Sequence, residues 1–144
     1  MQNRTISQVI AVFLFSISAA SFANPYDYKV TRVIDGDTVA FEANFLPAPL
    51  KPELSIRVLG VDTPEKGHRA ACPQEAEAAL KASAFTKSAI KNAKKVQILI
   101  EKHDKYGGRV LGDVIIDGKK LSELLIANGH ARPYFGEKKE SWCN

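Results

Sequence analysis

One long helix-forming segment divides this 144-residue chain into two groups of short strand-forming runs. Residues 74–93 are rich in alanine, lysine and glutamate. They follow Pro73, which suits the first turn of a helix because an N–H there has no helical partner. The apolar residues of the segment fall near one helical stripe, which we expect to face the core: Ala76, Leu80, Ala84, Phe85 and Ile90.

Five strand-forming runs flank this helix, three before it and two after it: residues 28–34, 38–42, 54–61, 95–100 and 109–116. Residues 44–52 hold three prolines within six residues, so they predict a long connection and not a central strand. A short amphipathic helix is expected at residues 121–128, with Gly129 in the left-handed conformation that ends many helices.

The resulting order of elements is β-β-β-α-β-β-α. Five short strands with one helix between the third and the fourth predict an α+β, mainly β domain. The expected architecture is a five-stranded Greek-key barrel of the oligonucleotide-binding (OB) type, carrying two helices.

The first 23 residues have the features of a secretory signal. Arg4 precedes an apolar run at residues 9–20, and small residues come before a cleavage point after Ala23. The run is shorter than the roughly 20 residues that a membrane-spanning helix needs, although an uncleaved anchor is the alternative. We therefore expect one domain at residues 24–144. It would be secreted or periplasmic and monomeric, with no stable protein partner and no membrane contact after cleavage.

The net charge of the expected domain does not by itself identify a partner. Its 19 basic and 16 acidic residues suit a polyanionic partner, but many soluble proteins have such an excess.

Cys72 and Cys143 are the two cysteines of the chain. Export favours a disulfide between them. Two metal-ligating thiols are the alternative, although no CxxC pair or close Cys/His spacing accompanies them.

Three turn-rich segments collect carboxylates and arginines: residues 33–38, 57–65 and 104–109. Asp37 and Asp62 each follow a strand, so both could lie at the same mouth of the barrel and hold a hard cation such as Ca²⁺. Taken singly, Asp37 is better explained as a residue of a hairpin turn, and Asp62 is equally well explained as a turn residue that ends a strand.

Glu65 comes three residues after Asp62, where it could accept a proton from an attacking water, or could be a solvated loop acid. Arg57 and Arg109 are candidate phosphate ligands, because guanidinium groups bind phosphate oxygens in pairs. The alternatives are a half-exposed strand side chain and a surface cation. Lys105 and Tyr106 could contact a second phosphate and a sugar or base.

Five segments in this order closely resemble the thermonuclease, or staphylococcal nuclease-like, family: residues 33–39 (VIDGDTV), 57–65 (RVLGVDTPE), 84–87 (AFTK), 92–95 (NAKK) and 104–109 (DKYGGR). The resemblance covers about residues 28–135. It implies an OB-fold barrel with helices and Ca²⁺ dependence. It also implies hydrolysis of DNA and RNA with little sequence preference, at the 5′ P–O bond, leaving 3′-phosphate ends.

The resemblance also implies roles for individual residues. Asp37, Asp62 and the backbone carbonyl of Thr63 would ligate Ca²⁺, Glu65 would be the general base, and the reacting phosphate would be bound by Arg57 and Arg109. Two departures stand out. The family has Tyr-Gly-Arg where this chain has an extra Gly108, and the chain ends at Asn144 without a third helix.

Two other functions are compatible with such a domain. A catalytically silent OB-fold module that binds nucleic acid would be expected to have lost a carboxylate or an arginine of the set, and an extracellular structural or inhibitory domain would not depend on a metal. All of the set is present, which favours the enzyme: Asp37, Arg57, Asp62, Glu65 and Arg109.

Overall fold

The computed structural model describes residues 23–47, 49–50 and 52–143. The expected signal therefore lies outside the described residues, apart from Ala23. The elements follow in the order β1 (Val30–Asp35), β2 (Thr38–Glu42), β3 (Glu53–Val58), β4 (Val61–Asp62), a 3-10 turn (Gly67–Arg69), α1 (Pro73–Asn92), β5 (Val96–His103), β6 (Arg109–Ile116), β7 (Lys119–Lys120), α2 (Leu121–Ala127) and β8 (Arg132–Pro133).

The main sheet is mixed. Its strands lie in the order β1-β2-β3-β6-β5, with β7 paired to β6. The β3–β6 pair is parallel and the other pairs are antiparallel. Strand pairing leaves the sheet open, since β1 and β5 are its two ends. An isolated bridge just before β1 joins Tyr26 to Ile98 of β5, with N···O distances of 2.8 Å in both directions. The predicted α+β, mainly β class is confirmed.

The third predicted strand is interrupted. Gly60 has φ +74°, a left-handed conformation that ends β3 and turns the chain. Val61 and Asp62 then form β4, which leaves the main sheet and pairs with β8 in a two-stranded sheet of its own. The expectation of one continuous strand at residues 54–61 was therefore wrong, because alternating apolar residues do not reveal a change of partner strand.

Both predicted helices are present within a residue of their expected bounds, but α1 turns a different face to the core. Leu80 is 66% exposed and Ala84 is also exposed, contrary to the predicted stripe, whereas Phe85 and Ile90 of that stripe are partly buried against the core as expected. The buried residues of α1 are small or polar: Glu75, Ala79, Ala82, Ser83 and Thr86. The reason is that α1 packs against backbone. A Cβ at Gly36, in the β1–β2 turn, would lie 2.8 Å from the Cβ of Ala82.

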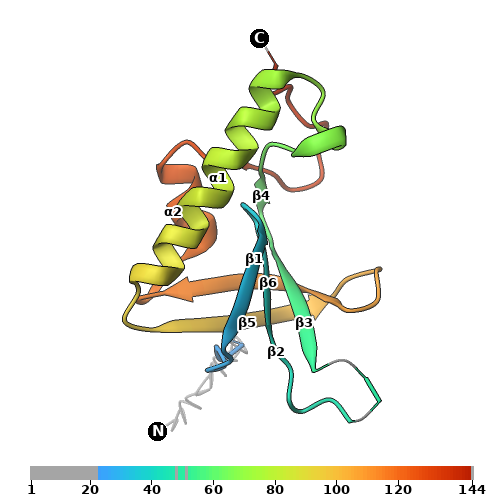
Figure 1. The fold of residues 1–144 in the computed structure, drawn as a ribbon, viewed down its shortest axis with the longest axis vertical. Helices are drawn as coiled ribbons and strands as arrows, with labels where there is room; N and C mark the ends of the chain where they lie inside the picture. The colour runs from blue at the N-terminus through green and yellow to red at the C-terminus, as the bar shows by residue number, and fades with distance from the viewer. Residues whose placement is uncertain (1–22, 48, 51, 144) are drawn as a thin grey trace, which may run out of the picture.

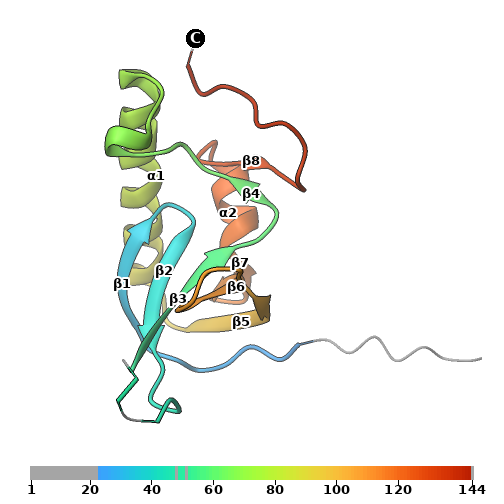
Figure 2. The same ribbon diagram turned by 90° about the vertical axis from the view of Figure 1, so that its right-hand side faces the viewer.

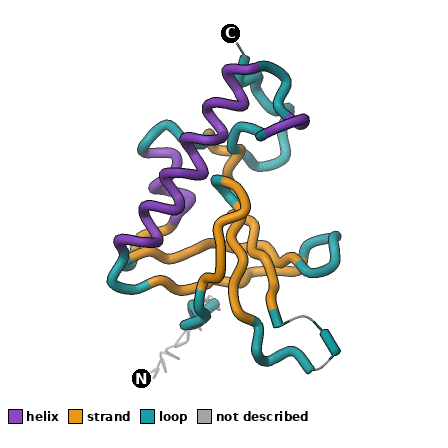
Figure 3. Tube along the Cα trace, in the orientation of Figure 1, coloured by secondary structure: helices purple, strands orange, loops and turns teal. Residues whose placement is uncertain are grey.

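The two helices lie together at one end of the strands, and the described residues of the β2–β3 connection (43–47, 49–50 and 52) lie at the other end (Figures 1 and 3). Leu121 and Leu125 of α2 are fully buried in a core that includes Phe41, Ile56 and Ile98. No helix in the described part of the chain is long and apolar enough to cross a bilayer.

The predicted cap at Gly129 is confirmed. Gly129 has φ +71°, its N–H donates to the carbonyl of Ile126 at 3.1 Å, and the N–H of His130 donates to the carbonyl of Leu125 at 2.8 Å. This pair of bonds is a Schellman motif, which satisfies the last carbonyls of α2.

Candidate active site

Five of the six residues predicted for the catalytic and metal sites line one cleft of about 250 Å³: Asp37, Arg57, Thr63, Glu65 and Arg109. Asp37 lies in the turn between β1 and β2, which α1 fixes because Thr86 Oγ1 donates to the carbonyl of Gly36 at 2.7 Å. The parallel pairing of β3 with β6 sets Ser55 opposite Arg109, which brings the end of the 104–109 loop beside Arg57.

Asp37 and Arg57 form an ion pair in this cleft. The Nη2 atom of Arg57 lies 3.2 Å from Oδ2 of Asp37, whose side chain is 3% exposed. Asp37 Oδ1 also accepts a hydrogen bond from Thr38 Oγ1 at 2.8 Å. A carboxylate withdrawn from water needs such partners, and the arginine supplies the compensating charge.

The loop that carries Glu65 is held by the first turn of α1. The N–H of Glu65 donates to Oε1 of Glu75 at 3.1 Å, and the N–H of Ala71 donates to Oε2 of the same residue at 2.7 Å. Glu75 is buried, and Cys72 caps the helix beside it. Sequence reasoning missed Glu75, because a glutamate in a helical segment gives no sign that it binds a preceding loop.

Arg69 ties the Glu65 loop to the β1–β2 turn. Its Nε lies 3.3 Å from the Glu65 carboxylate, and its Nη2 lies 3.5 Å from that of Asp35. Lys66 adds a 2.7 Å ion pair with Asp35. Sequence reasoning did not single out these three residues, although Arg69 stands four positions after Glu65, a spacing at which opposite charges often pair.

Arg109 is paired with a carboxylate of its own loop. Its Nε lies 2.5 Å from Oδ2 of Asp104, and its guanidinium carbon lies 5.0 Å from the centre of the Tyr106 ring. Burial opposes the charge on Asp104, but the hydrogen bond and charge of Arg109, together with backbone N–H groups of Tyr106 and Lys105, outweigh it, so the pKa of Asp104 is lowered. The extra Gly108 takes φ +78°, and its carbonyl accepts from the N–H of Ser55 at 3.0 Å. The longer loop therefore leaves Arg109 in the cleft.

Asp62, the remaining predicted metal ligand, faces another part of the molecule. It does not line the cleft described above, and its carboxylate meets the C-terminal tail, residues 137–143. Lys139 Nζ lies 2.5 Å from Oδ1, and Trp142 Nε1 donates to Oδ2 at 3.0 Å. The tail is covalently attached nearby, since the predicted disulfide between Cys72 and Cys143 is present. The bond holds Cys143 beside the start of α1, with the Cα atoms of the two cysteines 6.0 Å apart, and Figure 2 shows the C-terminal tail running toward that end of the helix.

The predicted metal ligands have the oxygen atoms that a hard cation binds, but they do not all lie close together. Asp37, Thr63 and Glu65 offer carboxylate and carbonyl oxygens around one cleft, and oxygen is the donor that Ca²⁺ prefers. Among the described residues, however, no three His, Cys, Asp or Glu side chains gather closely enough to hold a metal ion. One reason is that the Asp62 carboxylate faces the C-terminal tail and not the cleft that holds the other predicted ligands.

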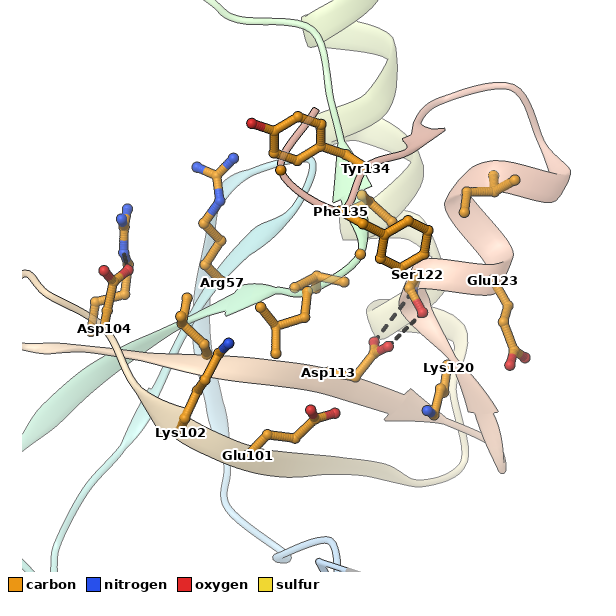
Figure 4. A pocket seen from close by; sticks show the side chains of 18 of the residues that line it. Arg57, Glu101, Lys102, Asp104, Asp113, Lys120, Ser122, Glu123, Tyr134 and Phe135 are labelled. Atoms are coloured by element: carbon orange, nitrogen blue, oxygen red, sulfur yellow. Dashed lines mark hydrogen bonds and ion pairs between the residues drawn. The ribbon is translucent and has the colours of Figure 1, made fainter. Parts of the chain in front are cut away.

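A larger cleft of about 1000 Å³ adjoins the first and shares Arg57 and Arg109 with it. The predicted substrate residues Lys105 and Tyr106 line it, as do Tyr134 and Phe135 of the C-terminal segment, which sequence reasoning did not single out. Figure 4 shows Tyr134 above the cleft near Arg57, and Phe135, 84% exposed, beside it. The larger cleft thus combines cations with exposed aromatic rings.

A buried acid closes the far end of the larger cleft. Asp113 accepts hydrogen bonds from the hydroxyl of Ser122 at 2.5 Å and from its N–H at 3.2 Å (Figure 4). Burial raises the pKa of Asp113, and these bonds oppose the shift only in part. Because Ser122 lies in the first turn of α2, Asp113 anchors the start of that helix to β6.

Comparison with known proteins identifies similar sequences. Residues 55–142 match the profile of a family described as staphylococcal nuclease homologue. The chain is 36% identical over 125 residues to the thermonuclease of Staphylococcus hyicus, covering 84% of this chain and 67% of that protein. It is 36% identical over 105 residues to the endonuclease YncB of Bacillus subtilis, covering 70% of this chain and 44% of that protein. The SPbeta prophage-derived endonuclease YokF of the same species is 34% identical over 110 residues, 74% of this chain and 33% of that protein.

Proposed function

The chain belongs to the staphylococcal nuclease homologue family, and we propose that it is an exported, Ca²⁺-dependent endonuclease that hydrolyses DNA and RNA with little sequence preference. Cleavage would occur at the 5′ P–O bond and leave 3′-phosphate ends. The nuclease activity is supported by the matched family and by its nuclease members. The metal, the substrate range and the export are the parts that experiments must test.

The observation that carries the proposal is the position of the two arginines. Arg57 and Arg109 lie where a small cleft that bears carboxylates meets a larger cleft that bears lysines and aromatic rings. A phosphodiester held by both guanidinium groups would place its phosphorus by the carboxylates. The neighbouring nucleotide would then lie along Lys105 and Tyr106, which suit a phosphate and a base. None of these contacts requires a particular base, in keeping with low sequence preference.

The residues of the small cleft suit hydrolysis by water. Glu65 would accept a proton from water as the water oxygen forms its bond to phosphorus and the bond to the 5′ oxygen breaks. Arg57 and Arg109 would stabilise the charge that grows on the phosphate oxygens. Asp37, the Thr63 carbonyl and Asp62 would hold Ca²⁺, which supplies positive charge to the phosphate and makes bound water more acidic.

Substrate binding requires both arginines to exchange partners. Arg57 is paired with Asp37 and Arg109 with Asp104. A bound cation at Asp37 would weaken the first pair, because it competes with Arg57 for the same carboxylate. Arg57 released in this way would be free to bind phosphate. A metal and a phosphate would therefore bind better together than either one alone.

Degradation of plasmid DNA and of a single-stranded RNA tests the proposal. We expect cleavage of both substrates with Ca²⁺ and none with excess chelator, and we expect the products to acquire a 3′ hydroxyl only after phosphatase treatment. Full activity in chelator would contradict the metal mechanism. Binding of both nucleic acids without cleavage at any Ca²⁺ concentration would instead support the silent OB-fold module.

Export is tested by expressing the full chain in a bacterium with a secretory pathway. We expect the protein outside the cytoplasm with Asn24 as its first residue, as read by mass spectrometry. An intact chain in the membrane fraction would show that residues 1–23 act as an anchor.

A further inference from the structure

The Asp62 carboxylate already has a cation in contact with it. Lys139 Nζ lies 2.5 Å from Oδ1, Trp142 Nε1 donates to Oδ2, and the Asp62 side chain is 5% exposed. We propose that Lys139 occupies the place of a metal ion at Asp62, so that the disulfide-bonded tail competes with Ca²⁺ for this carboxylate. The inference rests on the proposed function, since it concerns the regulation of that site.

The tail is built to stay over Asp62. The disulfide between Cys72 and Cys143 fixes its end next to α1. Arg132, which faces Asp62 in the β4–β8 pair, stacks its guanidinium 4.0 Å from the centre of the Trp142 ring. Arg132 Nη1 also donates to the carbonyl of Ser141 at 2.9 Å. Three separate interactions therefore hold the segment that delivers Lys139 and Trp142.

The competition follows from the charges. An ammonium group and Ca²⁺ cannot both contact Asp62 Oδ1, because their mutual repulsion at such a distance is large. If Lys139 left without replacement, a nearly buried carboxylate would lose its compensating charge, which is costly. Asp62 directly precedes Thr63, which lines the small cleft, so the inference requires the Asp62 side chain to leave Lys139 and Trp142 and not a change of fold.

The chain carries its own reporter for this exchange. Trp142 is the single tryptophan of the sequence, and its indole N–H is bonded to Asp62. Ca²⁺ that draws Asp62 away must break or alter that bond. We therefore expect Ca²⁺ to change the fluorescence emission of Trp142 in the oxidised, full protein, whether or not nucleic acid is present.

A matched pair of variants separates Lys139 from general charge effects. Lys139→Ala removes the competing ammonium, and Lys138→Ala removes the same charge from the adjacent residue. We expect the Ca²⁺ dissociation constant, measured by calorimetry, to fall by about five- to tenfold in Lys139→Ala relative to Lys138→Ala, the size of one modest ion pair. The Ca²⁺ dissociation constant of the disulfide-free variant Cys72→Ser/Cys143→Ser should also fall, because the tail that delivers Lys139 is no longer fixed next to α1. Serine at position 72 can still cap α1, so the helix itself should be preserved.

Three results would overturn the inference while the proposed function stands. They are unchanged or weaker Ca²⁺ binding in Lys139→Ala relative to Lys138→Ala, Trp142 emission that ignores bound Ca²⁺, or an Asp62→Asn variant that binds Ca²⁺ as the unaltered protein does. Weaker binding would mean that Lys139 orients Asp62 for the metal, and unchanged binding would mean that Lys139 does not affect the metal. Absence of Ca²⁺ binding in every variant would overturn both the inference and the proposed metal dependence.

Discussion

The guanidinium of Arg57 lies 3.2 Å from the Asp37 carboxylate, and Arg57 stands opposite Thr38 in the β2–β3 pair. Arg57, the predicted phosphate ligand, is thus paired with Asp37, a predicted metal ligand. Arg109 and Asp104 show the same relationship in the neighbouring loop. Each arginine is thus neutralised by a carboxylate in the unliganded protein, so the proposed binding of phosphate and metal would require both arginines to exchange partners.

Replacing Glu65 with glutamine should slow catalysis without preventing binding. The amide cannot accept the proton of the attacking water, so we expect kcat to fall by roughly 10²–10⁴-fold with KM nearly unchanged. The same change at the exposed Glu77 of α1 is the control. Loss of binding together with kcat would indicate that Glu65 holds substrate or metal and is not the base.

Replacing Arg109 with alanine should lower kcat and kcat/KM together, by roughly 10²–10³-fold, because one group that stabilises transition-state charge is lost. Exposed Arg32 of β1, replaced in the same way, controls for the change in net charge. Wild-type kinetics in Arg109→Ala would assign the role to another cation, for which Lys105 is the first candidate.

Deleting Gly108 should reduce activity. The deletion shortens the loop before Arg109 by one residue. The single glycine that remains must then supply both the turn that Gly108 makes at φ +78° and the carbonyl that accepts the N–H of Ser55, across a shorter span. Steady-state kinetics of the deletion variant provides the measurement. A rise in kcat would show that the longer loop holds Arg109 away from its best position.

Reducing the disulfide should destabilise the protein. In the chain-entropy model, a bond between residues separated by 71 positions stabilises by about 4 kcal/mol. We expect a lower urea midpoint after reduction, and no effect of reductant on Cys72→Ser/Cys143→Ser. Two titratable thiols in the oxidised, folded protein would contradict the bond.

Asp113 should make stability depend on pH. Burial raises its pKa in the folded state, so the folded protein holds the proton more tightly than the unfolded chain does. The favourable contribution is complete below the ordinary pKa of 3.8 and is lost as pH rises through the raised value. Asparagine stays neutral and still accepts the N–H of Ser122. The free energy of unfolding of Asp113→Asn, relative to the unaltered protein, should therefore increase with pH across that window. A constant difference would contradict this.

Much of the site was predictable because its residues sit in local patterns. Turns after strands located Asp37, Glu65 and Arg109, and the cleft does bring these three together with Arg57. The residues that position them were harder to predict. Glu75 binds the Glu65 loop from the first turn of α1, a contact that no local pattern encodes. The four-residue spacing of Glu65 and Arg69 does suit an ion pair, but it does not show that the pair holds a loop of the site.

The sequence alone determined the order of the longer strands and the helices, the bounds of α1 to within a residue, the Gly129 cap and the pairing of two cysteines, since each depends on short-range periodicity, turn chemistry or simple counting. It did not reveal the two-residue strands β4, β7 and β8. Tertiary structure alone decided which face of α1 is buried and where Asp62 points. Those depend on partners far along the chain: Gly36 lies against Ala82, and Trp142 is 80 residues from the carboxylate that it contacts. Side-chain orientation follows the lowest free energy of the assembled contacts, which exist only once the chain has folded.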